Sequence, residues 1–321
     1  MAWTVPSHKD VKFAVGLQTA IGATPSTYYA LPCPEEVDVD VDQGYDFFQM
    51  GGGGYRGETH YETKGAITTG KFTLPAYPGY TGVGDLYDWI WGRDTAANYY
   101  QGYWATLVKY VRRGSSAWVE TYPDCKVESG NVKLDYGAHF VALELNVKGI
   151  TLPTTGTSYV TEDTTLLGMT PYRFNQASIQ LDLGSGLAAE LLTRNHSLDF
   201  DNMLSQADGE NLDGYTTPSN LPNSEWTKWT VGFDRQFSDT ALRAAFLAGT
   251  ECAYVLTLTS GGTVCTFTMG RGIYEKAPLT LPNSGMIKQA ASMKALTPIA
   301  TGNDDPEDMW PCVISESPAG T

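Results

Sequence analysis

The sequence predicts a mostly β protein made of two tandem β-sandwich or half-barrel domains, each with one short flanking α-helix. Strand-favouring aromatic residues are abundant, with 19 Tyr, 8 Trp and 11 Phe among 321 residues. Turn-forming residues are also frequent, with 34 Gly and 17 Pro, so we expect many interrupted strands. The third observation is that one order of elements occurs twice along the chain.

The first elements are a short strand and an acidic strand. Residues 11–15 predict a strand, followed by an irregular arm that ends near Pro25. Residues 36–42 alternate strictly between acidic residues and valine. A period of two places alternate side chains on opposite faces, so Asp38, Asp40 and Asp42 should share one exposed face.

A loop and the remaining elements of the first half follow. Four consecutive glycines, Gly51 to Gly54, weaken any helix or strand, and we expect a long loop from Gln49 to about Lys64. The pattern then predicts these elements: a strand at 65–74, a short helix at 86–92, and strands at 105–111, 118–127 and 131–150, the last with a break near Tyr136-Gly137.

The second half repeats this order with little sequence identity. It contains a strand at 229–233, a capped helix between Ser238 and Gly249, a hairpin that joins 252–258 to 263–269 through Ser260-Gly261-Gly262, and a strand at 274–281. Leu198-Asp199-Phe200 corresponds to the acidic strand. The predicted divisions are a first domain at 1–150, a linker at 151–170, a second domain at 171–300 and a C-terminal tail at 301–321.

Composition argues against several classes of protein. The formal net charge is −15, from 21 Lys and Arg against 36 Asp and Glu. Proteins that grip nucleic acid need cations to neutralise phosphates, so this balance disfavours them. The five cysteines form no CxxC pair, which argues against zinc, and their odd number without a signal segment predicts reduced thiols. No stretch approaches the roughly 20 apolar residues of a membrane helix.

No catalytic constellation stands out. The chain lacks a G-x-S-x-G motif and a P-loop, and Gly184-Ser185-Gly186 fits a turn. The four histidines, His8, His60, His139 and His196, are scattered. Asp38, Asp40 and Asp42 stand about 7 Å apart along a strand, a spacing that calcium sites and glycosidases use, but ligand-bearing loops are missing beside them. We therefore predict no enzyme activity, no cofactor and no metal site.

The order of elements resembles the major tail tube proteins of siphophages, the bacteriophages with long non-contractile tails. The resemblance lies in the opening Gly16-Leu17-Gln18-Thr19-Ala20-Ile21-Gly22-Ala23-Thr24, the acidic strand and long loop, the segment 65–72 with its short helix, and the late strands at 124–134. It implies a tail-tube-like fold in each domain and inner sheets that join across subunits into one β-barrel around a channel.

The resemblance also implies location and partners. The chain would be a virion protein assembled in the host bacterial cytoplasm, and its partners would be its own copies and the tail terminator, tape measure and tail tip proteins. Double-stranded DNA would pass through without specific binding, and no membrane is involved. Each chain would contribute two tube-like domains, so three chains would supply six. We therefore expect trimeric, quasi-sixfold rings stacked head to tail.

Carboxylates are the candidates for the channel wall, because unpaired cations there would hold DNA back. The candidates are Asp38, Asp40 and Asp42, followed by Glu144 and Asp199. Exchange of Asp38, Asp40 and Asp42 for lysine should leave tube assembly intact and slow DNA delivery, more severely at low salt. The candidates for contacts between subunits are Gln49, Gly51, Gly52, Gly53, Gly54, Tyr55, Arg56, Glu58 and His60. The arm at 1–25 and the tail at 301–321 are expected to drape over a neighbouring subunit.

Two alternatives stay open. A head-tail connector or tail-terminator protein forms a single ring and needs no duplicated tube domain. A carbohydrate-binding or carbohydrate-cleaving β-sandwich would use exposed aromatic residues, for which Tyr99, Tyr100, Tyr103 and Trp104 are the candidates.

Overall fold

A computed structural model describes residues 11–33, 36–48, 60–77, 84–92, 103–113, 116–183, 186–190, 193–205, 220–222, 227–280, 287–297 and 310–318. The protein is mostly β, as predicted, and α1 (Gly84–Trp91) and α2 (Ala241–Ala248) are the two α-helices of this described part. The strands of the first half are β1 (Val11–Gln18), β2 (Tyr28–Ala30), β3 (Asp38–Phe48), β4 (His60–Pro75), β5 (Trp104–Arg113), β6 (Ser116–Asp135) and β7 (Ala142–Gly149).

Short strands connect the halves, and longer ones build the second half. The connecting strands are β8 (Thr154–Gly156) and β9 (Glu162–Asp163), followed by two short 3-10 helices. The strands of the second half are β10 (Ala177–Asp182), β11 (Leu187–Ala189), β12 (Thr193–Asp201), β13 (Lys228–Gln236), β14 (Cys252–Ser260), β15 (Thr263–Lys276), β16 (Leu279–Thr280), β17 (Lys288–Ala295) and β18 (Val313–Pro318).

The pairing of the strands follows one scheme in both halves. In the first half, β2, β1, β5 and the start of β6 pair in this order, and the end of β6 continues into β7, β4 and β3. In the second half, β11, β10, β14 and the start of β15 pair likewise, and the end of β15 continues into β17, β13 and β12. β8 and β18 occupy matching places beside β6 and β15.

Irregularities in the ladders coincide as well. The β5–β6 ladder shifts register between Ala105 and Leu107, and the β14–β15 ladder shifts between Cys252 and Tyr254. The β6–β7 ladder shifts after Val127, and the β15–β17 ladder shifts after Tyr274. Such bulges bend a strand, and here they lie where β6 and β15 pass from one set of partners to the next.

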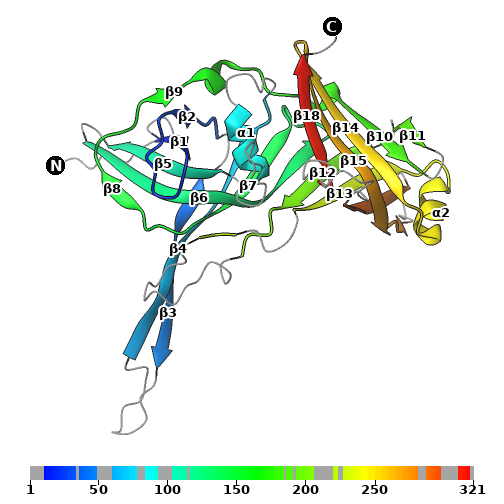
Figure 1. Ribbon diagram of the computed structural model, residues 1–321. Coiled ribbons are helices and arrows are strands. Elements are labelled where there is room, and N and C mark those ends of the chain that lie inside the picture. The colour runs from blue at the N-terminus through cyan, green and yellow to red at the C-terminus, as the bar shows by residue number, and fades with distance from the viewer. Residues whose placement is uncertain are drawn as a thin grey trace, which may run out of the picture.

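One ladder joins the halves edge to edge. β12 pairs antiparallel with the end of β6, from Asn195 opposite Asp135 to Asp201 opposite Ser129. A single sheet therefore runs through β3, β4, β7, β6, β12, β13, β17 and the end of β15. We call it the continuous sheet. Figure 1 shows the two halves side by side, with the β3–β4 hairpin projecting below the body and α2 at the far end of the second half.

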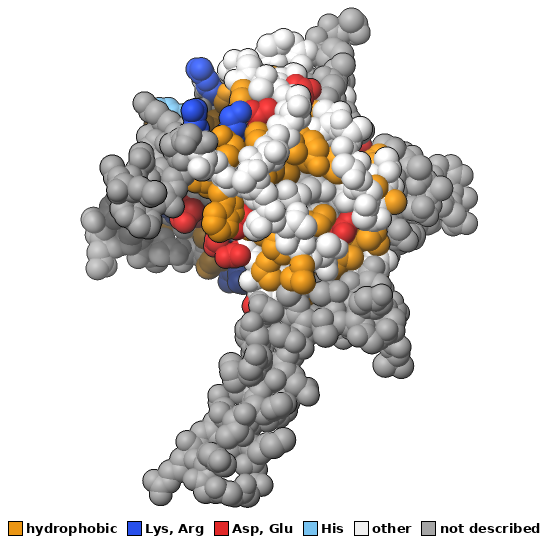
Figure 2. Space-filling view, turned by 90° about the vertical axis from the view of Figure 1, so that its left-hand side faces the viewer, with side chains coloured by type: hydrophobic (Ala, Val, Ile, Leu, Met, Phe, Trp, Pro, Cys, Tyr) orange, Lys and Arg blue, Asp and Glu red, His pale blue; other side chains and the backbone are white. Residues whose placement is uncertain are grey.

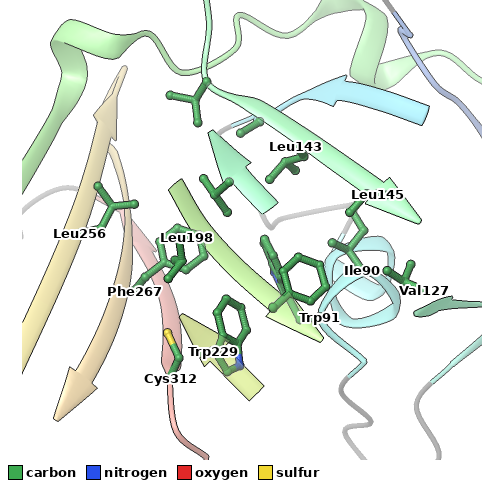
Figure 3. Packing of buried hydrophobic residues seen from close by; sticks show 14 of the residues in the cluster. Ile90, Trp91, Val127, Leu143, Leu145, Leu198, Trp229, Leu256, Phe267 and Cys312 are labelled. Carbon is green, nitrogen blue, oxygen red and sulfur yellow. The ribbon is translucent and has the colours of Figure 1, made fainter. Parts of the chain in front are cut away.

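A hydrophobic core extends through both halves, and α1 lies inside it. Trp91 meets the rings of Phe200, Trp229 and Phe267, whose centroids lie 5.2, 5.9 and 5.6 Å from its own. Ile90, on the same helix, is fully buried, and Figure 3 shows both side chains among residues of the first and second halves. The prediction of a glycine stop after each helix is confirmed, because Gly92 and Gly249 have φ of 68° and 60°.

Several sequence-based boundaries were wrong. The strand predicted at 11–15 is present, but β1 continues to Gln18, three residues into the segment expected to be an irregular arm. The tail does not hang free throughout, because β18 pairs with β15, and Trp310 and Cys312 before it are buried. Apolar residues in these short segments find distant partners, which local composition does not reveal. Residues 1–10 and 298–309 lie outside the described residues.

The connecting segment and the hairpin also differ from expectation. The segment at 151–170 folds back onto the first half, where β8 pairs with β6, β9 pairs with β2 and Leu166 is buried. The loop expected to reach Lys64 is shorter, because β4 already begins at His60 and pairs with β3 as far as Phe48. Aromatic residues flank the glycine run on both sides and favour this longer hairpin.

Candidate assembly surface

The continuous sheet has one polar face and one face on the core. Residues directly opposite each other in neighbouring strands point to the same side, so the registers identify each face. Val39, Leu145 and Leu198 belong to the core face and are fully buried. The polar face carries Asp38, Asp40, Asp42, Thr69, Lys71, Ser129, Asn131, Lys133, Glu144, Asn146, Lys148, Asn195, Ser197, Asp199, Asp201, Lys228 and Thr230.

Three lysines of this face, Lys71, Lys133 and Lys148, lie beside carboxylates. Glu144 lies at its centre, with its oxygens 3.9 Å from Lys71 Nζ and 3.5 Å from Lys133 Nζ. Lys148 forms an ion pair with Glu128. The charges of Glu144 and Asp135 raise the pKa of Lys133 above its usual value. Each exposed pair adds little stability, but each places a carboxylate beside a lysine that could otherwise pair with an anion.

Hydrogen bonds between neutral and acidic groups complete the polar face. Asn131 Nδ2 donates to Glu144 Oε2 over 3.3 Å, and Ser197 Oγ donates to Asp199 Oδ2 over 3.2 Å. Burial, together with the charge of Glu144, raises the pKa of Asp199 despite the Ser197 hydroxyl. Two shallow depressions of about 460 and 320 Å³ lie on the face, above β12 and beside β3. Neither depression is apolar enough to resemble a small-molecule site.

The structure brings the five predicted wall residues together on this face. Asp38, Asp40 and Asp42 are exposed on β3, as their alternation predicted. Glu144 lies two strands away on β7, and Asp199 lies on β12 in the second half. The face is not purely acidic, because lysines accompany the carboxylates. Single-strand alternation could not reveal these lysines, which come from four other strands.

Most of the predicted contact loop lies outside the described residues, namely Gln49, Gly51, Gly52, Gly53, Gly54, Tyr55, Arg56 and Glu58. His60 is the first residue of β4, opposite Phe48, rather than part of the loop. A deletion that tests the loop should therefore stop before His60, since removing residues to Lys64 would also shorten the ladder.

The other candidate groups do not converge. His196 is buried in the core, where its Nε2 lies 2.6 Å from the Tyr254 hydroxyl, and burial lowers the pKa of His196 to about 3. Cys125, Cys252 and Cys312 are buried free thiols. Within the described ranges no three His, Cys, Asp or Glu side chains are placed to hold a metal ion. The same part of the chain contains no helix long and apolar enough to cross a membrane.

The aromatic cluster expected for a sugar cleft is not exposed where the structure describes it. Trp104 is buried, and its ring packs against the ammonium of Lys126 at 4.5 Å and against a small cluster with Ile150 and Leu221. Tyr99 and Tyr100 lie outside the described residues. At the end of the molecule that Figure 2 shows, hydrophobic side chains are exposed in several places of the coloured part, and charged ones are fewer.

The sequence reasoning missed the two ends of the continuous sheet. β3 pairs with β4 alone, and the segment Lys276–Thr280 pairs with β17 alone, among the residues that the structure places. Near this second edge, Leu279 and Ile287 are 42% and 38% exposed. An open edge next to exposed apolar side chains is a surface on which another strand can pair.

Comparisons with protein-family models and with curated proteins find no match to this sequence. No relative therefore supplies a function, and the polar face and the open edges of the sheet are the features from which one can be inferred.

Proposed function

We propose that this chain is the subunit of a bacteriophage tail tube, a structural protein whose copies form rings that stack into a conduit for DNA. The observation that carries the proposal is the continuous sheet. Its polar face is rich in carboxylates, three of its lysines lie beside carboxylates, and among the described residues each of its two outer strands pairs on one side only. On this proposal the two halves are tandem tail-tube-like domains, and the polar face lines the channel. The chain is not an enzyme.

The physics of a conduit favours this use of the face. Each cation free to pair with phosphate adds affinity that does not depend on sequence, and several of them would arrest DNA. On the polar face Lys71, Lys133 and Lys148 have carboxylate partners. Unpaired acidic groups such as Asp38 repel the backbone over about a Debye length, roughly 8 Å at physiological salt.

The size of the sheet favours a ring of several chains. Barrels of 16–18 strands leave an aqueous channel, and a wider lumen needs more. Each chain offers the eight strands of the continuous sheet. Three chains joined edge to edge give a barrel of about 24 strands, wide enough for duplex DNA. Such rings would stack in the virion tail and meet the tail terminator, tape measure and tail tip proteins.

Electron microscopy of the purified chain tests this proposal. Negative-stain images across a range of protein concentrations should show striated tubes with a central channel. Single rings that never stack would favour the connector or terminator alternative instead. A chain that remains monomeric at every concentration would overturn the proposal.

A further inference from the structure

The ladder between β6 and β12 joins the two halves, and we call it the internal junction. The open edges of the continuous sheet can be compared with this junction, because the strand registers identify equivalent residues in the two halves. One row of cross-strand neighbours in the first half is Lys126, Lys148, Thr69 and Asp40. The matching row in the second half is Ile273, Lys294, Thr230 and Asp199. Counting along the strands from these rows makes Gly130 equivalent to Ala277, and Phe200 equivalent to Val41.

The internal junction then specifies an external one. Phe200 of β12 lies opposite Gly130 of β6. We infer that β3 of one copy pairs antiparallel with the segment Lys276–Thr280 of the next copy, with Val41 opposite Ala277 and Asp42 opposite Lys276. This inference deepens the proposed function and rests on it only in requiring that copies of the chain associate.

Backbone hydrogen bonding supports this register. The Asn202 N–H donates to the Glu128 carbonyl over 2.8 Å, in step with the β12–β6 ladder. Because such bonded pairs alternate along an antiparallel ladder, Phe200 and Gly130 also turn their backbone groups toward each other. The equivalent groups of Val41 and Ala277 should therefore point outward from their edges.

Charged side chains occupy these two outward groups in the single chain. The Val41 N–H donates to Asp40 Oδ1 over 2.7 Å. The Ala277 carbonyl accepts a hydrogen bond from Arg243 Nη1 over 3.1 Å. The inferred register would bring the Val41 N–H and the Ala277 carbonyl together. In the single chain each is hydrogen-bonded to a side chain, which the backbone of a neighbouring strand can replace. Charged side chains are one of the means by which native proteins protect an edge strand from unwanted pairing.

Pro278 does not obstruct the pairing. It is equivalent to Asn131, which lies opposite Glu144 of β7 and Asp199 of β12. In the alternation of the ladder, this position directs its backbone groups toward β7. The N–H that proline lacks would therefore face β17 and not the incoming strand.

Burial of apolar residues gives independent support. In the first half, Val132 and Val141 are fully buried. Their equivalents in the second half are the exposed Leu279 and Ile287. The second equivalence shows in matching bonds, since the Ala76 N–H donates to the Val141 carbonyl as the Phe237 N–H does to that of Ile287. In the first half the second half of the chain covers Val132 and Val141. A strand from another copy would cover Leu279 and Ile287 in the same way.

Side-chain size and charge also fit a second copy. A Cβ added to Gly130 would lie 2.8 Å from Phe200 Cζ, so the internal junction combines glycine with a large ring. The external junction would combine Ala277 with the smaller Val41. On the polar side, Asp42 would meet Lys276, and both are exposed in the single chain. The contact is heterologous, so repeating it produces a ring or a filament.

Cysteine cross-linking tests the register directly. Residues opposite each other in a pair that shares no backbone hydrogen bonds have Cβ atoms about 4.5–5.5 Å apart, near the reach of a disulfide. Asp42→Cys and Lys276→Cys are made in separate copies, mixed, allowed to assemble and oxidised. We expect a disulfide-linked dimer on non-reducing gels. The matched control replaces Asp42→Cys with Asp38→Cys, roughly 13 Å further along the same face, and should give at most a tenth of that product.

The outcomes separate the pairing from the tube. Tubes without the cross-link, or with equal cross-linking of the control, would overturn the register and leave the proposed function standing. Cross-linked oligomers that never stack would support the register and count against the tube. Failure to associate at all would overturn both. As a second measurement, Asp42→Lys and Lys276→Asp should each weaken association roughly threefold to tenfold, and mixing both variants should restore it.

Discussion

The two halves use the same strand pairings, yet their helices and edges have different surroundings. α1 is buried on all its long side chains, whereas α2 exposes Leu247 to 69%. The second half covers one edge of the first, whereas no described segment covers the corresponding edge of the second. The internal junction thus shows what a completed edge looks like, and the end near α2 shows an uncompleted one.

The largest expected effect comes from comparing one substitution in α1 with its counterpart in α2. Ile90 and Leu247 both lie two residues before the glycine that ends their helix. Ile90→Ala should lower the free energy of unfolding of the unassembled chain by about 2–5 kcal/mol, because it leaves a cavity in the core. Leu247→Ala should change it by less than about 0.5 kcal/mol. Urea unfolding of the two variants measures both values, and similar losses would contradict the assigned environments.

A second prediction concerns the histidine that the internal junction buries. Burial holds the pKa of His196 at about 3, while the unfolded chain titrates near 6.5. Between these values the unfolded state binds more protons, so stability falls as pH falls, by about 2 kcal/mol between pH 7 and pH 5. His196→Asn should remove this part of the pH dependence in urea titrations.

The matched control for this titration is His139, which is exposed. His139→Asn shows what the loss of an exposed imidazole does to the same measurement. If His196→Asn leaves the slope of stability against pH unchanged between pH 7 and pH 5, the imidazole is not held neutral inside the junction.

A third prediction sharpens the comparison between Gly130 and Ala277. Gly130→Ala should cost about 1–3 kcal/mol, since the new Cβ meets the Phe200 ring and the Glu144 carbonyl at 2.8 and 2.6 Å. In a Phe200→Val background, which copies the inferred pairing of Val41 with Ala277, the same substitution should cost less. A double-mutant cycle by urea unfolding measures this coupling, and additive effects would argue against the equivalence.

Local patterns in the sequence predicted the elements but not how they meet. The alternation of Asp38, Asp40 and Asp42 placed them on one face correctly, because strand geometry alone decides it. The glycine stops at Gly92 and Gly249 are equally local. In contrast, the burial of Val132 and the exposure of Leu279 depend on which segment lies beside each strand. These neighbouring segments are distant in sequence. Val132 and Leu279 are both apolar residues in predicted strands, so the local sequence does not show which of them is buried.

The smallest expected effect concerns Asp199, a polar-face carboxylate on the junction strand β12. Burial and the charge of Glu144 raise the pKa of Asp199, so folding disfavours its charged form relative to the unfolded chain. The raised pKa means that its contribution to stability is present at low pH and is lost as pH rises through the folded value. Asp199→Asn should therefore increase the free energy of unfolding at pH 7 by less than about 1 kcal/mol.

The matched variant is Asp40→Asn, at the equivalent place on the open edge, and it should not increase the free energy of unfolding. Urea unfolding at pH 7 compares the two, and destabilisation by Asp199→Asn would mean that this charge serves the fold. Stabilisation would mean that the Asp199 charge does not serve the fold of the single chain. Tubes built from the variant can then be tested for slower DNA delivery.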